Sequence, residues 1–515
     1  MGSIDVNTIS LRARTIAIIG AGPSGLVAAK YLRAEKAFDR IVLFEQRNRS
    51  GGIWNYTKDQ RDEDLFTIPQ TDPRGKNQDP TWLPSQRTKD GEKTGDRKEP
   101  SFLSPIYDRL ETNIPRGLMG FQDLDWPQDA QLFPKHSTVL KYIQDYGADV
   151  QDLIHYETQV LNVSPSDDAI SGRWNVLTRD LRSNARWNVL TRDLRSNARK
   201  EECYDAVIVA NGHFIVPYLP EIAGIEAWNA RHPGLISHAK YYRAPEDFTG
   251  KKVVVVGNSA SGSDISTQIA QFSQRPLLWS SKSSSMFNVS ASPVKRELPP
   301  IAKFLVETRG VEFEDETVEE GIDAVVFATG YFYSLPFLEG VRPGVIGDGG
   351  RVQYTYQHLF YAPRPTLSFL ALPQRVIPFP IAEAQSAVLA RVYAGRLNLP
   401  PLHDMQRWER NVIEEMGDGR DFHLLPFSKD GNYINELSHW AMSAEPREGL
   451  VNEGKGKIPP VWGAWEFWCR ENFPKIRAAF GALGEKRFTV RTLEEVGFIY
   501  SDAMKARAKQ EGKLI

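Results

Sequence analysis

The sequence predicts an α/β protein with two Rossmann-like dinucleotide-binding domains, the smaller inserted in the larger. Three observations predict this fold. An apolar strand, a glycine-rich turn and a helix follow one another in residues 15–32, and the same order returns in residues 253–270. Two further apolar strands, in residues 205–212 and 323–330, each end in a glycine. Each unit is therefore closed by a strand of similar sequence.

The first unit has two apolar strands around a helix. Residues 15–19 form an apolar run that leads to Gly20, and residues 41–44 form a second run. Between them, residues 25–32 carry apolar and small side chains at helical spacing. Continuous apolar strands on both sides of a helix are typical of a parallel sheet that is covered on both faces.

The second unit repeats the order of strand, glycine-rich turn and helix. Residues 253–256 form the strand and residues 257–262 the turn. A helix is expected from about Asp264, and a short strand follows at residues 277–280.

Composition excludes several classes of protein. The chain has 515 residues, of which 41% are hydrophobic and 25% charged, with a net charge of −2. These proportions are typical of globular proteins, and the missing basic excess argues against a nucleic-acid partner. The two cysteines, Cys203 and Cys469, exclude a disulfide framework. With no signal peptide and no apolar run of about 18 residues, we expect a cytoplasmic protein without membrane contact.

Two segments depart from the α/β pattern. Residues 56–100 are polar and charged, and they are interpreted as a long surface excursion. Thirteen residues, RWNVLTRDLRSNA, occur at 173–185 and again unchanged at 186–198. Alternating apolar side chains in this segment read as a strand. We expect one copy to form a sheet strand and the other to extend a hairpin loop or to be disordered. An assembly artefact of the sequence is the alternative to a functional insertion.

The first glycine turn carries a dinucleotide-binding pattern. Gly20, Gly22 and Gly25 form G-x-G-x-x-G between a strand and a helix. These glycines permit a tight turn and a close approach of the backbone to a pyrophosphate, while the helix start supplies amide donors. Glu45 ends the next strand, where a carboxylate accepts hydrogen bonds from a ribose. The alternative, a turn that only packs helix on strand, does not explain the acid.

The second turn differs in two positions that matter for cofactor choice. Ser259 replaces the middle glycine of residues 257–262. The next strand ends in Ser281 and Lys282 rather than in an acid. Hydroxyls and a cation suit a 2′-phosphate, which a carboxylate would repel. The second site therefore predicts NADP rather than NAD, unless Lys282 belongs to a solvated loop.

Two dinucleotide sites in one chain imply electron transfer between two cofactors, with a nicotinamide giving hydride to a flavin. We therefore expect an FAD-binding domain in residues 1–215, with the smaller NADP-binding domain inserted as residues 216–334. Residues 335–515 would return to the FAD domain and add a C-terminal helical segment. The helical stretch 382–396 and the tryptophan-rich segment 462–468 could supply that return.

Further segments resemble the flavin-containing monooxygenase family. Residues 51–54 (GGIW) resemble its GGxW segment, and residues 112–115 resemble the segment that places an Asn beside the flavin. Residues 232–242 match the fingerprint FxGxxxHxxxY, except that His232 replaces the first Phe.

The resemblance extends over roughly residues 14–475. Residues 328–331 resemble the family's ATGY strand end, and residues 383–385 resemble the start of the helix that returns to the flavin. The chain is most similar to the soluble, fungal-type branch, which includes thiol-oxidising enzymes. Residues 56–100, the duplication and the tail after residue 475 have no counterpart in the resemblance.

The resemblance implies a reaction. NADPH reduces FAD, O2 adds at the flavin C4a carbon to give a hydroperoxide, and a small-molecule sulfur or nitrogen nucleophile takes one oxygen atom. NADP⁺ stays bound and protects the hydroperoxide. Asn113 is implied as the catalytic residue that holds the nicotinamide and flavin edges, although the residues alone would favour a turn or capping role beside Pro115.

The residues expected to bind FAD and NADP(H) come from the two turns, the GGxW segment, the Asn segment and the returning helix. They are Gly20, Gly22, Pro23, Ser24, Gly25, Glu45, Gln46, Gly52, Ile53, Trp54, Thr112, Asn113, Val160, Gly257, Asn258, Ser259, Ala260, Ser261, Gly262, Ser281, Lys282 and Gln385.

Other functions share parts of this pattern. A Baeyer–Villiger monooxygenase acting on ketones has the same two sites, but its fingerprint typically ends in Trp where this chain has Tyr242. A disulfide reductase would need a C-x-x-C pair, which is absent. A non-catalytic nucleotide-binding protein stays open, as does a homodimer. Histidine spacing predicts no metal site; His213 is a candidate for the cleft, and His238 a link between the domains.

Overall fold

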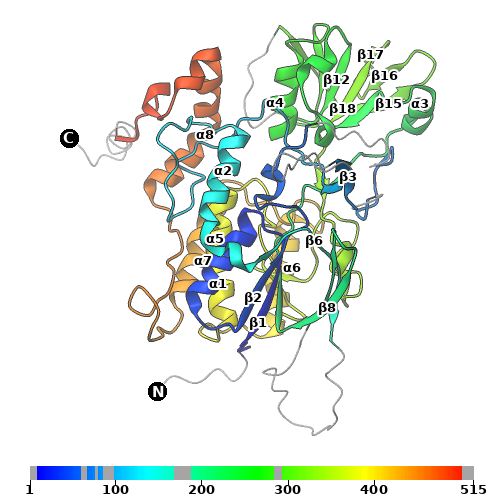
Figure 1. The fold of residues 1–515 in the computed structure, drawn as a ribbon. Helices are drawn as coiled ribbons and strands as arrows, with labels where there is room; N and C mark the ends of the chain where they lie inside the picture. The colour runs from blue at the N-terminus through cyan, green and yellow to red at the C-terminus, as the bar shows by residue number, and fades with distance from the viewer. Residues whose placement is uncertain are drawn as a thin grey trace, which may run out of the picture.

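The structure is a computed structural model in which two α/β bodies lie one above the other (Figure 1). Between them, β10 (Val216–Pro217) and β19 (Tyr331–Phe332) pair as two antiparallel crossing segments. The first copy of the duplication, residues 173–185, lies outside the described residues. The structure describes residues 8–58, 66–75, 79–84, 98–166, 187–283 and 293–501.

The larger body is built on a seven-stranded sheet in which the first strand of the chain, β1 (Thr15–Ile19), lies third from one edge. Ile16 of this strand pairs with Ile41 on one side and with Ala206 on the other. The last five strands of the order below run parallel, and their buried apolar side chains explain the uninterrupted hydrophobic runs. In spatial order the strands are β20 (Thr355–Tyr356), β21 (Phe360–Tyr361), β22 (Leu367–Phe369), β9 (Ala206–Val209), β1 (Thr15–Ile19), β2 (Arg40–Phe44) and β5 (Ile154–His155).

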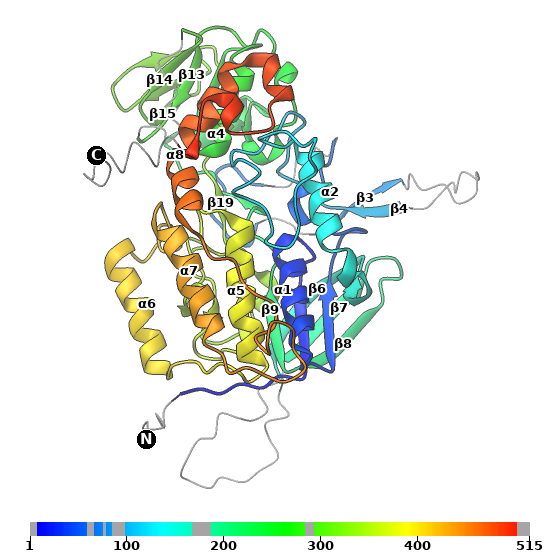
Figure 2. The ribbon, with the colours of Figure 1, turned by 90° about the vertical axis from the view of Figure 1, so that its left-hand side faces the viewer.

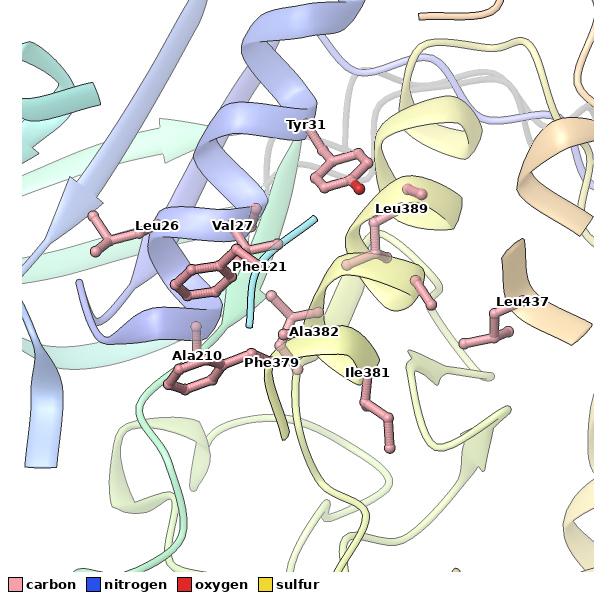
Figure 3. Packing of buried hydrophobic residues seen from close by; sticks show 14 of the residues in the cluster. Leu26, Val27, Tyr31, Phe121, Ala210, Phe379, Ile381, Ala382, Leu389 and Leu437 are labelled. Carbon is pink, nitrogen blue, oxygen red and sulfur yellow. The ribbon is translucent and has the colours of Figure 1, made fainter. Parts of the chain in front are cut away.

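Helices cover one face of this sheet. α1 (Pro23–Glu35) packs against α5 (Pro378–Tyr393), and Val27 and Tyr31 of α1 point toward α5 in Figure 3. Phe121 stacks on Phe379 with ring centroids 4.6 Å apart. α5 is buried on all sides because α7 (Lys429–Met442) packs against it as well. The other helices of this body are α2 (His136–Tyr146), α6 (Leu402–Met416), α7 (Lys429–Met442) and α8 (Ala464–Ala482).

A three-stranded antiparallel sheet covers the opposite face. Its middle strand β7 (Trp187–Asp193) comes from the second copy of the duplicated segment and lies between β6 (Thr158–Pro165) and β8 (Arg199–Tyr204). Trp187 is 0% exposed, and its indole nitrogen donates to the hydroxyl of Thr366 at 3.0 Å. One copy of the duplication therefore supplies a core strand, as predicted.

The smaller body has five parallel strands. α4 (Ala260–Ile269) covers one face of its sheet. The other face is covered by α3 (Ile225–Arg231) and by an antiparallel sheet of β15 (Ile301–Leu305), β16 (Gly310–Phe313) and β17 (Val318–Glu319). In spatial order the five strands are β11 (Ile236–His238), β18 (Ala324–Phe327), β12 (Val253–Val256), β13 (Leu277–Ser280) and β14 (Lys295–Leu298).

The five parallel strands in each of the two main sheets confirm the predicted fold class, with a smaller Rossmann-like domain inserted in a larger one. The domain boundaries at residues 215 and 334 stay predictions. The returning helix was expected at residues 382–396 but begins at Pro378, because proline is accepted in the first turn of a helix. It ends before Gly395, whose φ of +74° breaks the helix.

Two peripheral features complete the fold. The hairpin of β3 (Thr81–Pro84) and β4 (Lys98–Ser101) projects from the body within the predicted surface excursion (Figure 2). In the part of the chain that the structure describes, no helix has the length and apolar character needed to cross a bilayer.

Candidate functional site

A cavity of about 1730 Å³ lies between the two parallel sheets. Its walls come from the carboxyl ends of strands in both bodies: Gly20 follows β1, Ala210 follows β9, Gly257 follows β12 and Ala328 follows β18. Open parallel sheets bind ligands at this edge, beyond the carboxyl ends of the strands. The fold thus brings the two glycine turns, which are more than two hundred residues apart in sequence, to one space.

The first turn needs its outer glycines for packing. Gly20 has a φ of +100°, and a Cβ there would lie 2.7 Å from the carbonyl oxygen of Ala210. A Cβ on Gly25 would lie 2.0 Å from the carbonyl oxygen of Gly20. Gly25 therefore packs helix on strand and does not itself line the cavity.

Gly22 is glycine for a different reason. A Cβ on Gly22 would approach the protein no closer than 3.5 Å, at the Cα of Gly52. None of the described residues requires glycine here, yet Gly22 faces the cavity at the start of α1 beside Pro23 and Ser24. The space that a side chain would fill is the place where a pyrophosphate would meet the helix amides.

Glu45 is fixed at the end of β2. It is 3% exposed, and its carboxylate accepts the backbone N–H groups of Ala21 at 2.9 Å and Arg47 at 2.8 Å. Each oxygen keeps a further lone pair for a ribose hydroxyl. Glu45 and Gln46 both line the cavity, so the residues present fit the adenosine half of a dinucleotide.

The GGxW segment packs against the first turn. Gly51 has a φ of +116° and donates its N–H to the carbonyl of Ala21 at 2.9 Å. Gly52 begins a 3₁₀ turn that ends at Trp54, and both line the cavity together with Ile53. This segment therefore forms a second wall around the pyrophosphate position.

The second turn repeats the geometry of the first. Gly257 has a φ of +108°, and a Cβ there would lie 2.6 Å from the carbonyl oxygen of Ala328. A Cβ on Gly262 would lie 2.1 Å from the carbonyl oxygen of Gly257. Ser259 replaces the middle glycine at a φ of −74°, which any residue adopts, and it is exposed to the cavity. Gly262 is packed away from the cavity like Gly25; Asn258, Ala260 and Ser261 line it.

The two sites differ at the end of the second strand. Where Glu45 follows β2, Ser281 and Lys282 follow β13, and both line the cavity. Lys282 is exposed, and none of the described residues is in position to pair with its ammonium group. The Asn258 amide donates to the carbonyl of Ser283 and holds this loop against the glycine turn.

Asn113 lines the same cavity on a segment that precedes α2. It is half-buried, and its neighbour Thr112 is fixed by a backbone bond to Pro134 at 2.9 Å and a hydroxyl bond to Ile114 at 2.9 Å. No described residue forms a hydrogen bond with the Asn113 amide, as a capping role would require. Val160 of β6 lines the cavity as well.

Gln385 is the one predicted cofactor residue from the returning helix, and its side chain does not line the cavity. It is fully buried, accepts the N–H of Ala371 at 2.8 Å and donates to the hydroxyl of Tyr433 at 2.9 Å. Ala371 does line the cavity, at a φ of +56°. Any effect of Gln385 on a cofactor would therefore pass through the backbone of Ala371.

Sequence reasoning missed three sets of lining residues. The loop of residues 370–379 forms one wall, and its signal was the proline-rich run before α5. Arg47 and Lys240 add positive charge, and burial lowers the pKa of Lys240 to about 8. The helix α8 contributes Arg477, which no sequence motif predicted.

Some of the histidines line the cavity and others are buried in the core. Burial lowers the pKa of His213 to about 4 and that of His238 to about 3, so both cavity residues are neutral at pH 7. His358 is buried away from the cavity, with its Nδ1 2.9 Å from Nδ1 of His423. Within the described ranges, no three His, Cys, Asp or Glu side chains are grouped to hold a metal ion.

Two nucleotide sites that open on one cavity define a two-dinucleotide oxidoreductase, in which a nicotinamide can meet a flavin. Comparison with known proteins agrees. The flavin-binding monooxygenase-like family model matches residues 95–293 and 296–445, and a NAD(P)-binding Rossmann-like domain matches residues 18–69.

Relatives are similar over most of their length. A flavin-containing monooxygenase of Arabidopsis thaliana, FMO GS-OX-like 4, is 33% identical over 77% of this chain and 79% of its own. The flavin-containing monooxygenase iboF of Amanita muscaria is 29% identical over 84% and 89%. The structure of S-allyl-L-cysteine S-oxygenase from Allium sativum superposes with a TM-score of 0.71 at 26% identity, covering 98% of this chain and 99% of that one.

The chain belongs to the flavin-containing monooxygenase family. It is a flavin-dependent monooxygenase whose cofactors are FAD and NADP(H), which confirms the resemblance found in the sequence.

Proposed function

We propose that the enzyme takes its electrons from NADPH and transfers one oxygen atom of O2, carried as the flavin C4a-hydroperoxide, to a soft sulfur or nitrogen atom of a small molecule. One observation carries the proposal: two turns of the same geometry face one cavity, and that cavity is also lined by Asn113, whose amide has no hydrogen-bond partner among the described residues. When bound, the flavin would supply the reactive oxygen, and the chain would supply position and shielding.

The residues of the first site would hold FAD. The backbone amides at the start of α1 would meet the pyrophosphate where Gly22 leaves room, and Glu45 would accept from the adenosine ribose. The residues of the second site would hold NADPH, with Lys282 beside the 2′-phosphate.

Asn113 would act by position rather than by proton transfer. An amide donates a hydrogen bond without offering a proton, so it can hold the nicotinamide and flavin edges without promoting peroxide release. His213 and His238 support the same chemistry, because their lowered pKa values keep them neutral and unable to protonate a peroxide at pH 7.

Sulfur is favoured over nitrogen by the comparisons. The garlic enzyme of 26% identity is named for oxygenation at the sulfur of S-allyl-L-cysteine. A ketone substrate has less support: cyclohexanone monooxygenase shares the fold at a TM-score of 0.51 and only 14% identity.

Stopped-flow absorbance tests the proposal. The NADPH-reduced enzyme is mixed with O2 without a substrate, and we expect an oxygenated flavin spectrum that outlasts the oxidation of free reduced flavin. Adding a thiol or thioether should then speed its decay in proportion to product formed, and ketones should not. An immediate return to oxidised flavin with one peroxide per NADPH would contradict a monooxygenase mechanism.

A further inference from the structure

The Asn113 segment is held through Glu111 by two arginines of the C-terminal part of the chain. Glu111 is only 7% exposed on its side chain. Its Oε2 lies 3.3 Å from Nη2 and 3.4 Å from Nη1 of Arg477, and both of its oxygens lie 3.2 Å from Nε of Arg487. One carboxylate thus ties together the cavity segment, α8 and the 3₁₀ turn that follows it.

The backbone around Glu111 is fixed on its other side. Glu111 pairs as an antiparallel bridge with Lys135, just before α2. The same stretch of chain is tied to the C-terminal part a second time, because Leu132 donates its N–H to the carbonyl of Val490 at 3.0 Å. The segment that carries Asn113 therefore lies between α2 and the C-terminal residues, and the Glu111 carboxylate closes that arrangement.

Arg477 also faces the inserted domain. It lines the cavity, as do Asp264 and Thr267 of α4. Burial raises the pKa of Asp264, and the Arg477 guanidinium opposes that rise while Glu111 adds to it, so these three charges share one environment. Figure 2 shows α8 rising from the helices of the larger domain to the level of α4. The C-terminal helix thus reaches both nucleotide-binding domains.

We propose that residues 464–501 form a C-terminal brace that positions Asn113, with Glu111, Arg477 and Arg487 as its positioning residues. The inference rests on the proposed function, since it assigns a task to the Asn113 amide. The brace fixes the distance between the segment that carries Asn113 and the face of α4 that lines the NADP side of the cavity. Its two arginines lie beyond residue 475, where the resemblance found in the sequence ends, and the brace serves the coupling of NADPH oxidation to oxygen transfer.

Loosening the brace should impair the reaction. The rate enhancement that a well-oriented contact provides falls about a hundredfold when the contact is misplaced by about 1 Å. Asn113 would then hold the nicotinamide less well, water would reach the flavin edge, and electrons from NADPH would leave as hydrogen peroxide. We expect FAD retention to change little when Arg487 is replaced, because Arg487 does not line the cavity and the first glycine turn and Glu45 keep their positions.

Arg487→Gln is the informative variant, because Arg487 does not line the cavity. Lys475→Gln, an exposed position on α8, is the matched control. Two quantities are measured for each purified FAD-loaded protein: hydrogen exchange of backbone amides in residues 110–114 without NADPH, and the fraction of NADPH electrons recovered as peroxide. We expect Arg487→Gln to raise both the hydrogen exchange and the peroxide fraction, the latter three- to tenfold, while KM for NADPH stays unchanged. Arg487→Lys should restore part of the lost coupling.

A double-variant cycle separates the brace from a general loss of stability. Glu111→Gln with Arg487→Gln should be no worse than Glu111→Gln alone, because both remove one interaction. Additive effects, or exchange and peroxide equal to those of the control, would overturn the brace even where Asn113→Ala uncouples the enzyme. If Asn113→Ala leaves coupling intact, the proposed function of Asn113 fails, and unchanged exchange in Arg487→Gln would still overturn the brace by itself.

Discussion

The carbonyl oxygen of Gly20 lies where a side chain on Gly25 would begin, since a Cβ there would be only 2.0 Å away. Gly257 and Gly262 repeat the relationship at 2.1 Å. In both turns the helix packs directly on the end of its strand, and the start of each helix lines the cavity. The shared geometry explains why two distant segments can present two dinucleotides to one space.

Substitutions in the first turn should separate packing from ligand binding. Gly25→Ala forces its Cβ into backbone, so we expect a large loss of thermal stability with and without FAD. Gly22→Ala places its Cβ at an ordinary contact distance of 3.5 Å, so the protein should fold but bind FAD on the order of tenfold more weakly. Thermal unfolding and flavin content measured together check both; a Gly22→Ala enzyme with full flavin affinity would remove that residue from the site.

Lys282 should determine the preference for NADPH. A charged contact to the 2′-phosphate is worth about 1.5–3 kcal/mol, which is roughly ten- to a hundredfold in affinity. Lys282→Ala is therefore expected to raise KM for NADPH by that factor and to leave KM for NADH nearly unchanged. Lys303→Ala, an exposed lysine of the same domain away from the cavity, is the control. Equal effects on both nucleotides would show that Lys282 does not contact the phosphate.

Glu383 should make stability depend on pH. The carboxyl group is fully buried between α1 and α5, accepts the N–H of Gln122 at 3.1 Å, and burial raises its pKa to about 8. The unfolded chain ionises this group near pH 4.5, so its contribution to stability is complete below that pH and is lost as the pH rises toward 8.

Glu383→Gln removes that dependence. We expect the free energy of unfolding to rise by roughly 1–4 kcal/mol at pH 8 and to change little at pH 4. Urea denaturation at the two pH values measures it, with the exposed Glu436→Gln on α7 as control. A variant that is destabilised equally at both values would mean that the ionised group is held by partners and that burial does not dominate.

The duplication should be dispensable. Deleting residues 173–185 or 186–198 gives the same chain, which keeps one copy for β7. Loop length costs only about 0.6 kcal/mol per doubling, so the shortened protein should keep its flavin and its stability. In that shortened chain, replacing the buried Trp187 by Ala should cost about 3–5 kcal/mol. In the full chain the cost should be smaller, since the first copy, residues 173–185, can supply the strand. Equal costs in urea denaturation would contradict this.

Local chemistry explains what the sequence could predict. Within one strand–turn–helix unit, the sequence predicts the roles of Gly20, Gly25 and Glu45, because backbone conformation and hydrogen bonding act over a few residues. Gln385 was read as a cofactor residue, but its partner Ala371 is in the left-handed region, which no pattern marks. The contact of Arg477 with Glu111 joins residues 366 positions apart and depends on tertiary packing alone.

Isotope tracing tests the central claim most directly. The enzyme is supplied with NADPH, a thioether and ¹⁸O2 in ordinary water, and the sulfoxide is analysed by mass spectrometry against NADPH consumed and peroxide released. Our account predicts one ¹⁸O atom in each sulfoxide and close to one sulfoxide for each NADPH. A sulfoxide without label, or peroxide equal to the NADPH consumed with no labelled product from any sulfur or nitrogen compound, would contradict it.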